Sequence, residues 1–241
     1  MNAYRKLCTE FYDLDKPAAP TEALERYVRH AREAAGPILE PMCGSGRFLV
    51  PLRLRGFDID GIDASPQMLE ACRQKLARLG LHATLLQQRM EAVQLDRRYA
   101  LVIIPAGSFT LITDPHDVAE ALRRMYDAML PAAKLVLELE LAAPQPSSSW
   151  PWGGRWIQRN DGARIVISWL GHHEATTRIT HSIHRYELIH DGRLLETEFE
   201  ELDTRAYDDR EIRELLTSSG FAEVTVHQLE GANAVIECAR P

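Results

Sequence analysis

Apolar residues along the first 141 positions follow two alternating patterns. Residues 21–35 repeat apolar side chains at helical intervals, with Ala23, Tyr27 and Ala31 each four positions apart. Residues 99–104 (YALVII) are apolar throughout, which is typical of a strand buried on both faces of a sheet. Because helical and strand-like stretches alternate, the pattern predicts a parallel sheet with helices on both faces.

Local signals place the ends of several elements. Ser65-Pro66 and Asp114-Pro115 each combine a favourable helix cap with a proline at the first helical position. They predict helices over residues 66–79 and 115–130. The remaining elements expected in this half are strands at 37–40, 57–63, 82–88 and 134–141, a short helix at 47–55, and a short or irregular helix at 90–98.

The pattern changes at residue 142. Residues 142–154 (AAPQPSSSWPWGG) are rich in Pro, Ser and Gly and mark a boundary. Residues 155–205 are strand-like and contain turn signals, of which Asp191-Gly192 fits a hairpin between two long strands. This segment therefore predicts inserted antiparallel strands.

The first pattern returns after residue 206. Asp208 with Glu211 resembles a capping box that opens a helix, and two strands joined by Glu230-Gly231 follow it. The chain as a whole predicts an α/β fold with a doubly wound, mostly parallel seven-stranded sheet and helices on both faces. The expected organisation is a core of residues 1–141 and 207–241, with inserted antiparallel strands at 142–206.

Composition and charge narrow the class of protein. Of the 241 residues, 45% are hydrophobic and 26% are charged, as in an ordinary soluble globular protein. The net charge of −7 argues against a large phosphate-binding surface. The sequence has neither a signal-peptide-like N-terminus nor a membrane-length apolar run, and its four cysteines are widely spaced. We therefore expect a cytoplasmic protein with no nucleic-acid or membrane partner.

A constellation of acidic residues and glycines carries the candidate chemistry. Glu40 follows a short apolar run, Gly44 and Gly46 form a G-x-G turn, and Asp63 ends the next expected strand. The dinucleotide fingerprint fails because Leu49 stands where a third glycine is required, and this disfavours a nicotinamide-dependent dehydrogenase. A ligand with an adenosine but no pyrophosphate fits, and S-adenosylmethionine (SAM) is such a ligand. Glu40 would attract its ammonium group, the glycines would lie against its methionine tail, and Asp63 would hold its ribose hydroxyls.

The spacing Glu40-x-x-x-Gly44-x-Gly46, with Asp63 on the next strand, resembles motif I and its acidic partner in class I SAM-dependent methyltransferases. Four further stretches resemble sequences of the same family, at residues 63–68, 98–103, 130–133 and 211–221. The resemblance implies SAM as cofactor, S-adenosylhomocysteine as product, and a leading segment at 1–20 that folds over the cofactor. It assigns cofactor binding to Tyr12, Glu40, Gly44, Ser45, Gly46, Asp63, Ala64, Met68, Arg89, Met90 and Pro105.

Some of these positions also have simpler interpretations. Methyltransferases usually carry an acidic residue for the adenine after the third strand, whereas this chain has Gln88 and Arg89, so the backbone of Met90 is the alternative. Met68 and Tyr12 are equally well explained by core packing, and Arg89 by an ordinary ion pair. These departures motivate a second hypothesis, a SAM-binding protein without transferase activity that serves as a sensor or partner subunit.

The sequence does not single out a catalytic residue. His181 and His184 in the inserted segment are the candidates for a general base, but they have opposite parity on a strand, which argues against a shared metal site. Methyl transfer requires mainly alignment of the reacting atoms, and a base only when the acceptor arrives protonated. Residues 104–109 (IPAGSF) lack the motif of enzymes that methylate nucleobase amino groups. The expected partner is therefore a small-molecule acceptor, and a homodimer stays open as the assembly.

Overall fold

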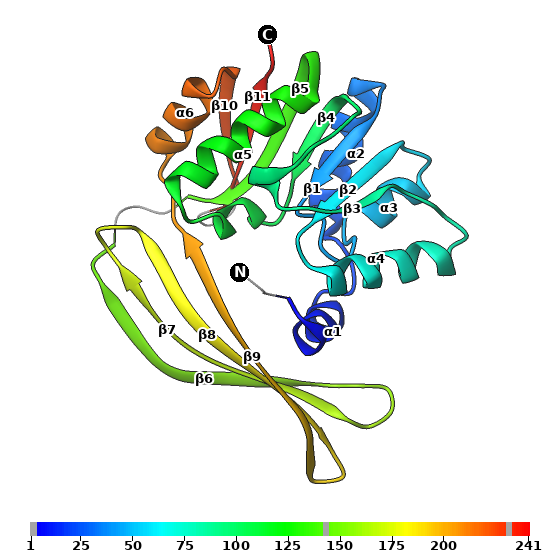
Figure 1. Ribbon diagram of the computed structural model, residues 1–241, viewed down its shortest axis with the longest axis vertical. Helices are drawn as coiled ribbons and strands as arrows, with labels where there is room; N and C mark the ends of the chain where they lie inside the picture. Colours follow the sequence, from blue (N-terminus) through cyan, green and yellow to red (C-terminus); the bar gives the residue numbers. More distant parts are fainter. Residues whose placement is uncertain (1–3, 142–144, 230–232) are drawn as a thin grey trace.

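A seven-stranded sheet forms the centre of the protein (Figure 1). The computed structural model describes residues 4–141, 145–229 and 233–241. The strand order is β10-β11-β5-β4-β1-β2-β3, in which β11 runs antiparallel to β5 and β10 while the others are parallel. This confirms the predicted fold class. The strands are β1 (Ile38–Pro41), β2 (Ile59–Asp63), β3 (Leu85–Gln87), β4 (Tyr99–Ile104), β5 (Met129–Glu140), β10 (Ala222–Gln228) and β11 (Asn233–Ala239).

Helices cover both faces of this sheet. Along β4, Leu101 and Ile103 pack toward one face of the sheet while Val102 and Ile104 pack toward the other. All positions of β4 except the partly buried Ala100 are buried, which explains the continuous apolar run in the sequence. The first face is covered by α2 (Thr21–Ala34), α3 (Leu49–Leu54) and α4 (Pro66–Arg78), and the second by α5 (Pro115–Ala128), α6 (Asp209–Ser218) and the short helix η1 (Met90–Ala92).

The expected helix caps form, with one difference. The Ser65 hydroxyl accepts a hydrogen bond from the Met68 amide (3.1 Å), and the Asp114 carboxylate accepts one from the His116 amide (2.8 Å). Asp208 accepts from the Glu211 amide at 2.8 Å, as in a capping box. The Glu211 carboxylate instead pairs with Arg178 and Arg205, so it is used to join α6 to the inserted strands.

The inserted segment forms a second, four-stranded antiparallel sheet below the core (Figure 1). Its strands, in order, are β6 (Ser148–Gln158), β7 (Arg164–Glu174), β8 (Ile179–His190) and β9 (Arg193–Arg205). Asp191 and Gly192 form the predicted hairpin turn with φ values of 49° and 72°. Strand β6 begins at Ser148, inside the stretch expected to be a boundary. Residues 142–144 of that boundary and the Glu230-Gly231 turn lie outside the described residues.

Helix α1 (Lys6–Asp15) lies between the core and the inserted sheet (Figure 1). Its apolar side packs on β7 and β8 through a cluster of Leu7, Cys8, Phe11, Ile165, Ile167 and Tyr186. Its other end reaches the core, where Asp13 accepts hydrogen bonds from Ser45 and Lys75. Among the described helices, none is long and apolar enough to cross a membrane.

Candidate functional site

A cavity lies where β1, β2 and β4 end at their carboxyl edge, on the side of the core that faces α1 and the inserted sheet. Ligands of open α/β sheets bind at this edge, where the strand order reverses. The walls come from the loops that follow these strands, from α1 and from β9. Its lining includes Tyr4, Tyr12, Glu40, Met42, Cys43, Gly44, Arg47, Phe48, Asp63, Ala64, Ser65, Met68, Gln88, Arg89, Met90, Glu91, Pro105, Ala106, Ser108, Leu111, Ile112 and Leu202. We call it the cofactor cavity.

Glu40 contributes a buried carboxylate to this cavity. The residue is only 2% exposed, and its Oε2 atom has no hydrogen-bond partner among the described residues. Burial raises the pKa of Glu40 well above its usual range, the charge of Asp63 raises it further, and a hydrogen bond from the Leu49 backbone opposes both. A buried oxygen without a donor is unfavourable unless a ligand supplies one. A positively charged ammonium group fits this position.

Asp63 is fixed by the backbone on both sides. Its two carboxylate oxygens accept hydrogen bonds from the Gly44 and Ser65 amides, each at 2.8 Å. Burial raises its pKa, while these hydrogen bonds lower it. Each oxygen keeps a lone pair, so the carboxylate can accept the two hydroxyls of a ribose without moving.

The two glycines of the motif have different roles. Gly44 lines the cavity with φ of +55°, and a Cβ there would meet only the Met68 sulfur at 3.8 Å. Gly46 does not line the cavity. A Cβ on it would lie 2.6 Å from the Cys72 sulfur, so this glycine permits close packing of the turn against α4.

Ser45 also lies away from the cavity lining. It is 1% exposed, and its hydroxyl donates to Asp13 of α1, while Lys75 donates to its carbonyl at 3.0 Å. The sequence placed Ser45 and Gly46 against the cofactor. Neither residue is among the described residues that line the cofactor cavity, and Ser45 lies where the motif turn contacts α1.

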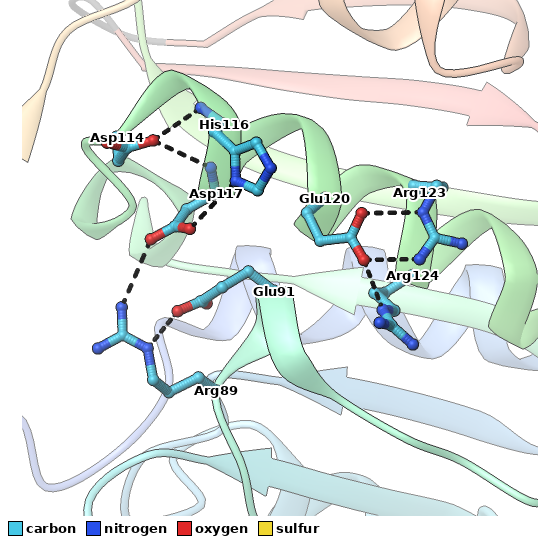
Figure 2. Close-up of polar contacts among 8 residues, drawn as sticks. All are labelled: Arg89, Glu91, Asp114, His116, Asp117, Glu120, Arg123 and Arg124. Atoms are coloured by element: carbon cyan, nitrogen blue, oxygen red, sulfur yellow. Dashed lines mark hydrogen bonds and ion pairs between the residues drawn. The ribbon is translucent and has the colours of Figure 1, made fainter.

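Arg89 lines the cofactor cavity but is already paired. Figure 2 shows its guanidinium between Glu91 and Asp117, with the Asp117 contact at 3.9 Å. Asp114, His116 and Asp117 gather at the start of α5 because Asp114 caps that helix (Figure 2). The contacts of Arg89 thus tie the wall of the cavity to α5.

Gln88 is likewise engaged within its own loop. Its side chain accepts from the Gln94 amide at 2.8 Å and donates to the Gln94 carbonyl at 3.3 Å. Both ends of the Gln88 amide are therefore engaged. The Met90 backbone is the other part of this loop that the sequence analysis named as a contact for the adenine.

Several cavity residues were not predicted from the sequence. Phe48 and Arg47 follow the glycine turn, and Leu202 comes from β9 of the inserted sheet. The position of Leu202 depends on strand register, since Leu202 pairs with Ser182 and faces inward. The glycine motif was the available signal for Arg47 and Phe48, whereas a single sequence carries none for Leu202.

A second cavity of about 540 Å³ adjoins the first. It lies between the ends of β4 and β5, the start of α2 and the inner face of the inserted sheet. The two cavities share Arg47, Phe48 and Ala106. Its other lining residues are Pro20, Ala23, Gly107, Thr110, Glu138, Glu140, Gln145, Ser148, Trp150, His173, Arg178, Thr180, Thr204, Arg205, Ala206 and Asn233. We call it the second cavity.

The two candidate histidines lie elsewhere. His181 pairs with Asp203 at 3.0 Å and stacks on His172, with the ring centres 5.0 Å apart. His184 lies beside Tyr186, and burial lowers its pKa. Neither His181 nor His184 is among the described residues that line the two cavities, whereas His173 is.

Comparison with known proteins agrees with this geometry. Residues 38–132 match the family model described as "Methyltransferase domain". The chain is 24% identical over 214 residues to the "Putative methyltransferase YqeM" of Bacillus subtilis, covering 87% of this chain and 83% of that protein.

Two solved structures share the fold over nearly their whole length. The sugar N-methyltransferase KedS8 from Streptoalloteichus aligns with a TM-score of 0.76 at 21% identity, covering 100% of this chain and 96% of that one. SAM-bound CalS10, an amino pentose methyltransferase from Micromonospora echinaspora, aligns with a TM-score of 0.73 at 18% identity, covering 100% and 99%.

The sheet order and the cavity at its carboxyl edge define the class I, Rossmann-like fold of SAM-dependent methyltransferases. Residues 38–132 match a methyltransferase domain, and the relative and the two solved structures that resemble the chain are methyltransferases, which supports an enzyme of this kind with SAM as its cofactor. This confirms the resemblance found in the motif residues.

Proposed function

We propose that the protein transfers the methyl group of SAM to a small polar acceptor bound in the second cavity. The observation that carries this proposal is the common wall of the two cavities, formed by Arg47, Phe48 and Ala106. A donor and an acceptor bound next to these shared residues can meet where the two cavities adjoin. Such alignment contributes about 7–11 kcal/mol to lowering a barrier.

The cofactor residues divide by the part of SAM that they bind. In this proposal Glu40 receives the ammonium group, because its buried oxygen lacks a donor. Asp63 receives the ribose hydroxyls, and the Met90 backbone receives the adenine. Tyr12 on α1 lines the cavity on the side of the inserted sheet, and in this proposal the N-terminal segment serves as a lid.

The inserted sheet serves the acceptor. In this proposal residues 142–206 are an addition to a core of residues 1–141 and 207–241, and the inner face of the inserted sheet supplies Ser148, Thr180 and Thr204 to the second cavity. KedS8 and CalS10 are named for sugar and amino pentose acceptors. Their full-length similarity to this chain supports a small polar acceptor of comparable size.

When bound, SAM supplies an electrophilic methyl group on a positively charged sulfur. The protein contributes binding, orientation and the exclusion of water. Phe48 and Ala106 present apolar side chains where the two cavities adjoin, next to the path of the methyl group.

Calorimetry with SAM, followed by a turnover assay, tests the proposal. Asp63→Ala should weaken SAM binding at least about 10-fold, since a hydrogen bond to a charged group contributes about 1.5–3 kcal/mol. Asp209→Ala, which removes an exposed carboxylate on α6, is the matched control and should bind normally. SAM binding without methyl transfer to any acceptor in a broad panel would favour the sensor hypothesis instead.

A further inference from the structure

Glu138 lies at the boundary between the two cavities. It is on β5, near the carboxyl end of the strand, and its side chain lines the second cavity. Its Oε2 atom accepts a hydrogen bond from the amide of Ala106 at 3.3 Å. Because Ala106 belongs to the wall shared by both cavities, the carboxylate lies next to the place where donor and acceptor would meet.

A buried tyrosine orients this carboxylate. The Tyr27 hydroxyl donates to the same Oε2 atom at 3.2 Å, and Tyr27 is 0% exposed. Burial raises the pKa of Tyr27 well above its usual value, and the charge of Glu138 raises it further. The hydroxyl therefore stays protonated and keeps donating, so the Glu138 side chain has a fixed orientation.

The second oxygen, Oε1, is available to a ligand. Within 4–141, 145–229 and 233–241, no hydrogen bond or ion pair engages Oε1, and no cation pairs with Glu138. Glu140 adds a second carboxylate to the same cavity. Three arginines line this cavity: Arg178 and Arg205 pair with Glu211 at 2.8 and 2.6 Å, and Arg47 donates to the Ala18 carbonyl at 3.0 Å. Carboxylates without a counter-ion in a half-enclosed cavity favour a cationic ligand.

From this arrangement we infer that Glu138 is a catalytic residue that binds the protonated amine of the acceptor and takes up its proton. The inference rests on the proposed function and specifies its substrate class as a small amine. The carboxylate first accepts a proton from the ammonium group, which leaves a lone pair on nitrogen. The positive sulfonium nearby assists this loss by charge repulsion. The lone pair then forms the new N–C bond as the C–S bond breaks, its electrons stay on sulfur, and Glu138 returns the proton to water.

The variant Glu138→Gln separates catalysis from structure. Glutamine can still accept from Tyr27 and Ala106 through its carbonyl oxygen, but it neither carries a charge nor takes up a proton. Tyr27→Phe removes only the orienting hydroxyl of a positioning residue, and Glu138→Asp keeps the charge. Glu214→Gln, an exposed change of the same kind on α6, is the control.

The assay uses labelled SAM and paired acceptors that differ in one group, namely glucosamine, galactosamine and further primary amines against their hydroxyl counterparts. We expect transfer to amines. Glu138→Gln should lower kcat/KM about 100-fold, as for loss of a general base, with SAM affinity unchanged. Glu138→Asp should recover part of the loss, and Tyr27→Phe should lower kcat several-fold.

Binding provides a second measurement that does not depend on turnover. In ligand-observed NMR with protein loaded with S-adenosylhomocysteine, the amine of a pair should bind the wild type better than its hydroxyl partner, and Glu138→Gln should remove this preference. Transfer to hydroxyl acceptors alone, or amine transfer unaffected by Glu138→Gln, would overturn the inference while leaving the proposed function standing. Bound SAM without transfer to either kind of acceptor would count against the proposed function itself.

Discussion

Single residues distinguish two ways of burying a carboxylate at the cofactor cavity. Asp63 has backbone donors on both oxygens, whereas Glu40 has a buried oxygen without one. Because the pKa of Glu40 is raised, its ionised form destabilises the ligand-free fold. Protonated Glu40 therefore contributes stability to the ligand-free fold. This contribution is fully present below pH 4.5, the ordinary pKa of the group, and is lost as the pH rises through the raised pKa.

A proton-linkage experiment tests this role of Glu40. A bound ammonium group stabilises the ionised carboxylate, so SAM binding should release a proton wherever the free protein holds one on Glu40. Calorimetry in buffers of different ionisation enthalpy measures the released fraction. Glu40→Gln should abolish the release and flatten the pH dependence of the free protein's Tm above the ordinary carboxyl pKa of 4.5. Equal proton release by the variant would assign the linkage to another group.

Gly46 gives a prediction about stability alone. Gly46→Ala adds a Cβ at 2.6 Å from the Cys72 sulfur and imposes φ of +81° on a residue that disfavours it. We expect a loss of about 1–3 kcal/mol in the free energy of unfolding, measured with denaturant. Cys72→Ala should recover part of this loss in the double variant. An unchanged Gly46→Ala would show that the turn has more space than the contact indicates.

The sequence specified some of these residues and not others, for a physical reason. Glu40, Gly44 and Asp63 occupy fixed positions relative to strand ends, so the motif alone predicted that they meet. Gly46 was read as a ligand contact because a glycine that relieves packing and one that admits a ligand look alike in sequence. Glu138 was not identified, because its significance depends on Tyr27, which lies 111 positions away.

Helix α1 is the element that joins the two sheets. Buried Glu198 on β9 accepts from the Leu7 and Cys8 amides at 3.3 and 3.1 Å, and Glu200 accepts from the Arg5 amide at 2.6 Å. These are the free amides at the start of a helix, where negative charge is stabilising. The inserted sheet therefore holds the start of α1, whose Tyr12 lines the cofactor cavity.

Removing this charge should loosen the lid. In Glu198→Gln, we expect SAM affinity to fall about 3- to 10-fold, since a charge at a helix N-terminus contributes up to about 2 kcal/mol. Calorimetry measures the affinity, and limited proteolysis should cut more rapidly near α1. Glu201→Gln, exposed on the same strand, is the control. Unchanged affinity in both variants would contradict a lid role for α1.

At the level of elements, local chemistry predicted most helix starts but fewer strand limits. Ser65 and Asp114 carry their own capping groups, so short sequences sufficed. Strand β6 was placed too late because the Pro-, Ser- and Gly-rich stretch at 142–154, which includes Pro151, suggested a boundary. The proline is accommodated because β6 is an edge strand with an irregularity between Trp150 and Gly153.

The whole molecule couples a cofactor core to an acceptor sheet through β9. This strand contacts α1 through Glu198 and Glu200, the cofactor cavity through Leu202, and the second cavity through Thr204. Binding of S-adenosylhomocysteine should therefore slow amide hydrogen exchange in α1, in the part of β9 from Glu198 to Arg205, and around the glycine turn. Protection confined to residues 38–112 would show that the inserted sheet does not respond to the cofactor.

The most direct test is a crystal structure with S-adenosylhomocysteine bound. We expect the ribose of the ligand at Asp63, its ammonium group at Glu40, and its sulfur next to Phe48 and Ala106. The sulfur should face the second cavity and Glu138. A ligand bound outside the cofactor cavity, or with its sulfur directed away from that wall, would contradict the proposal that methyl transfer takes place between the two cavities.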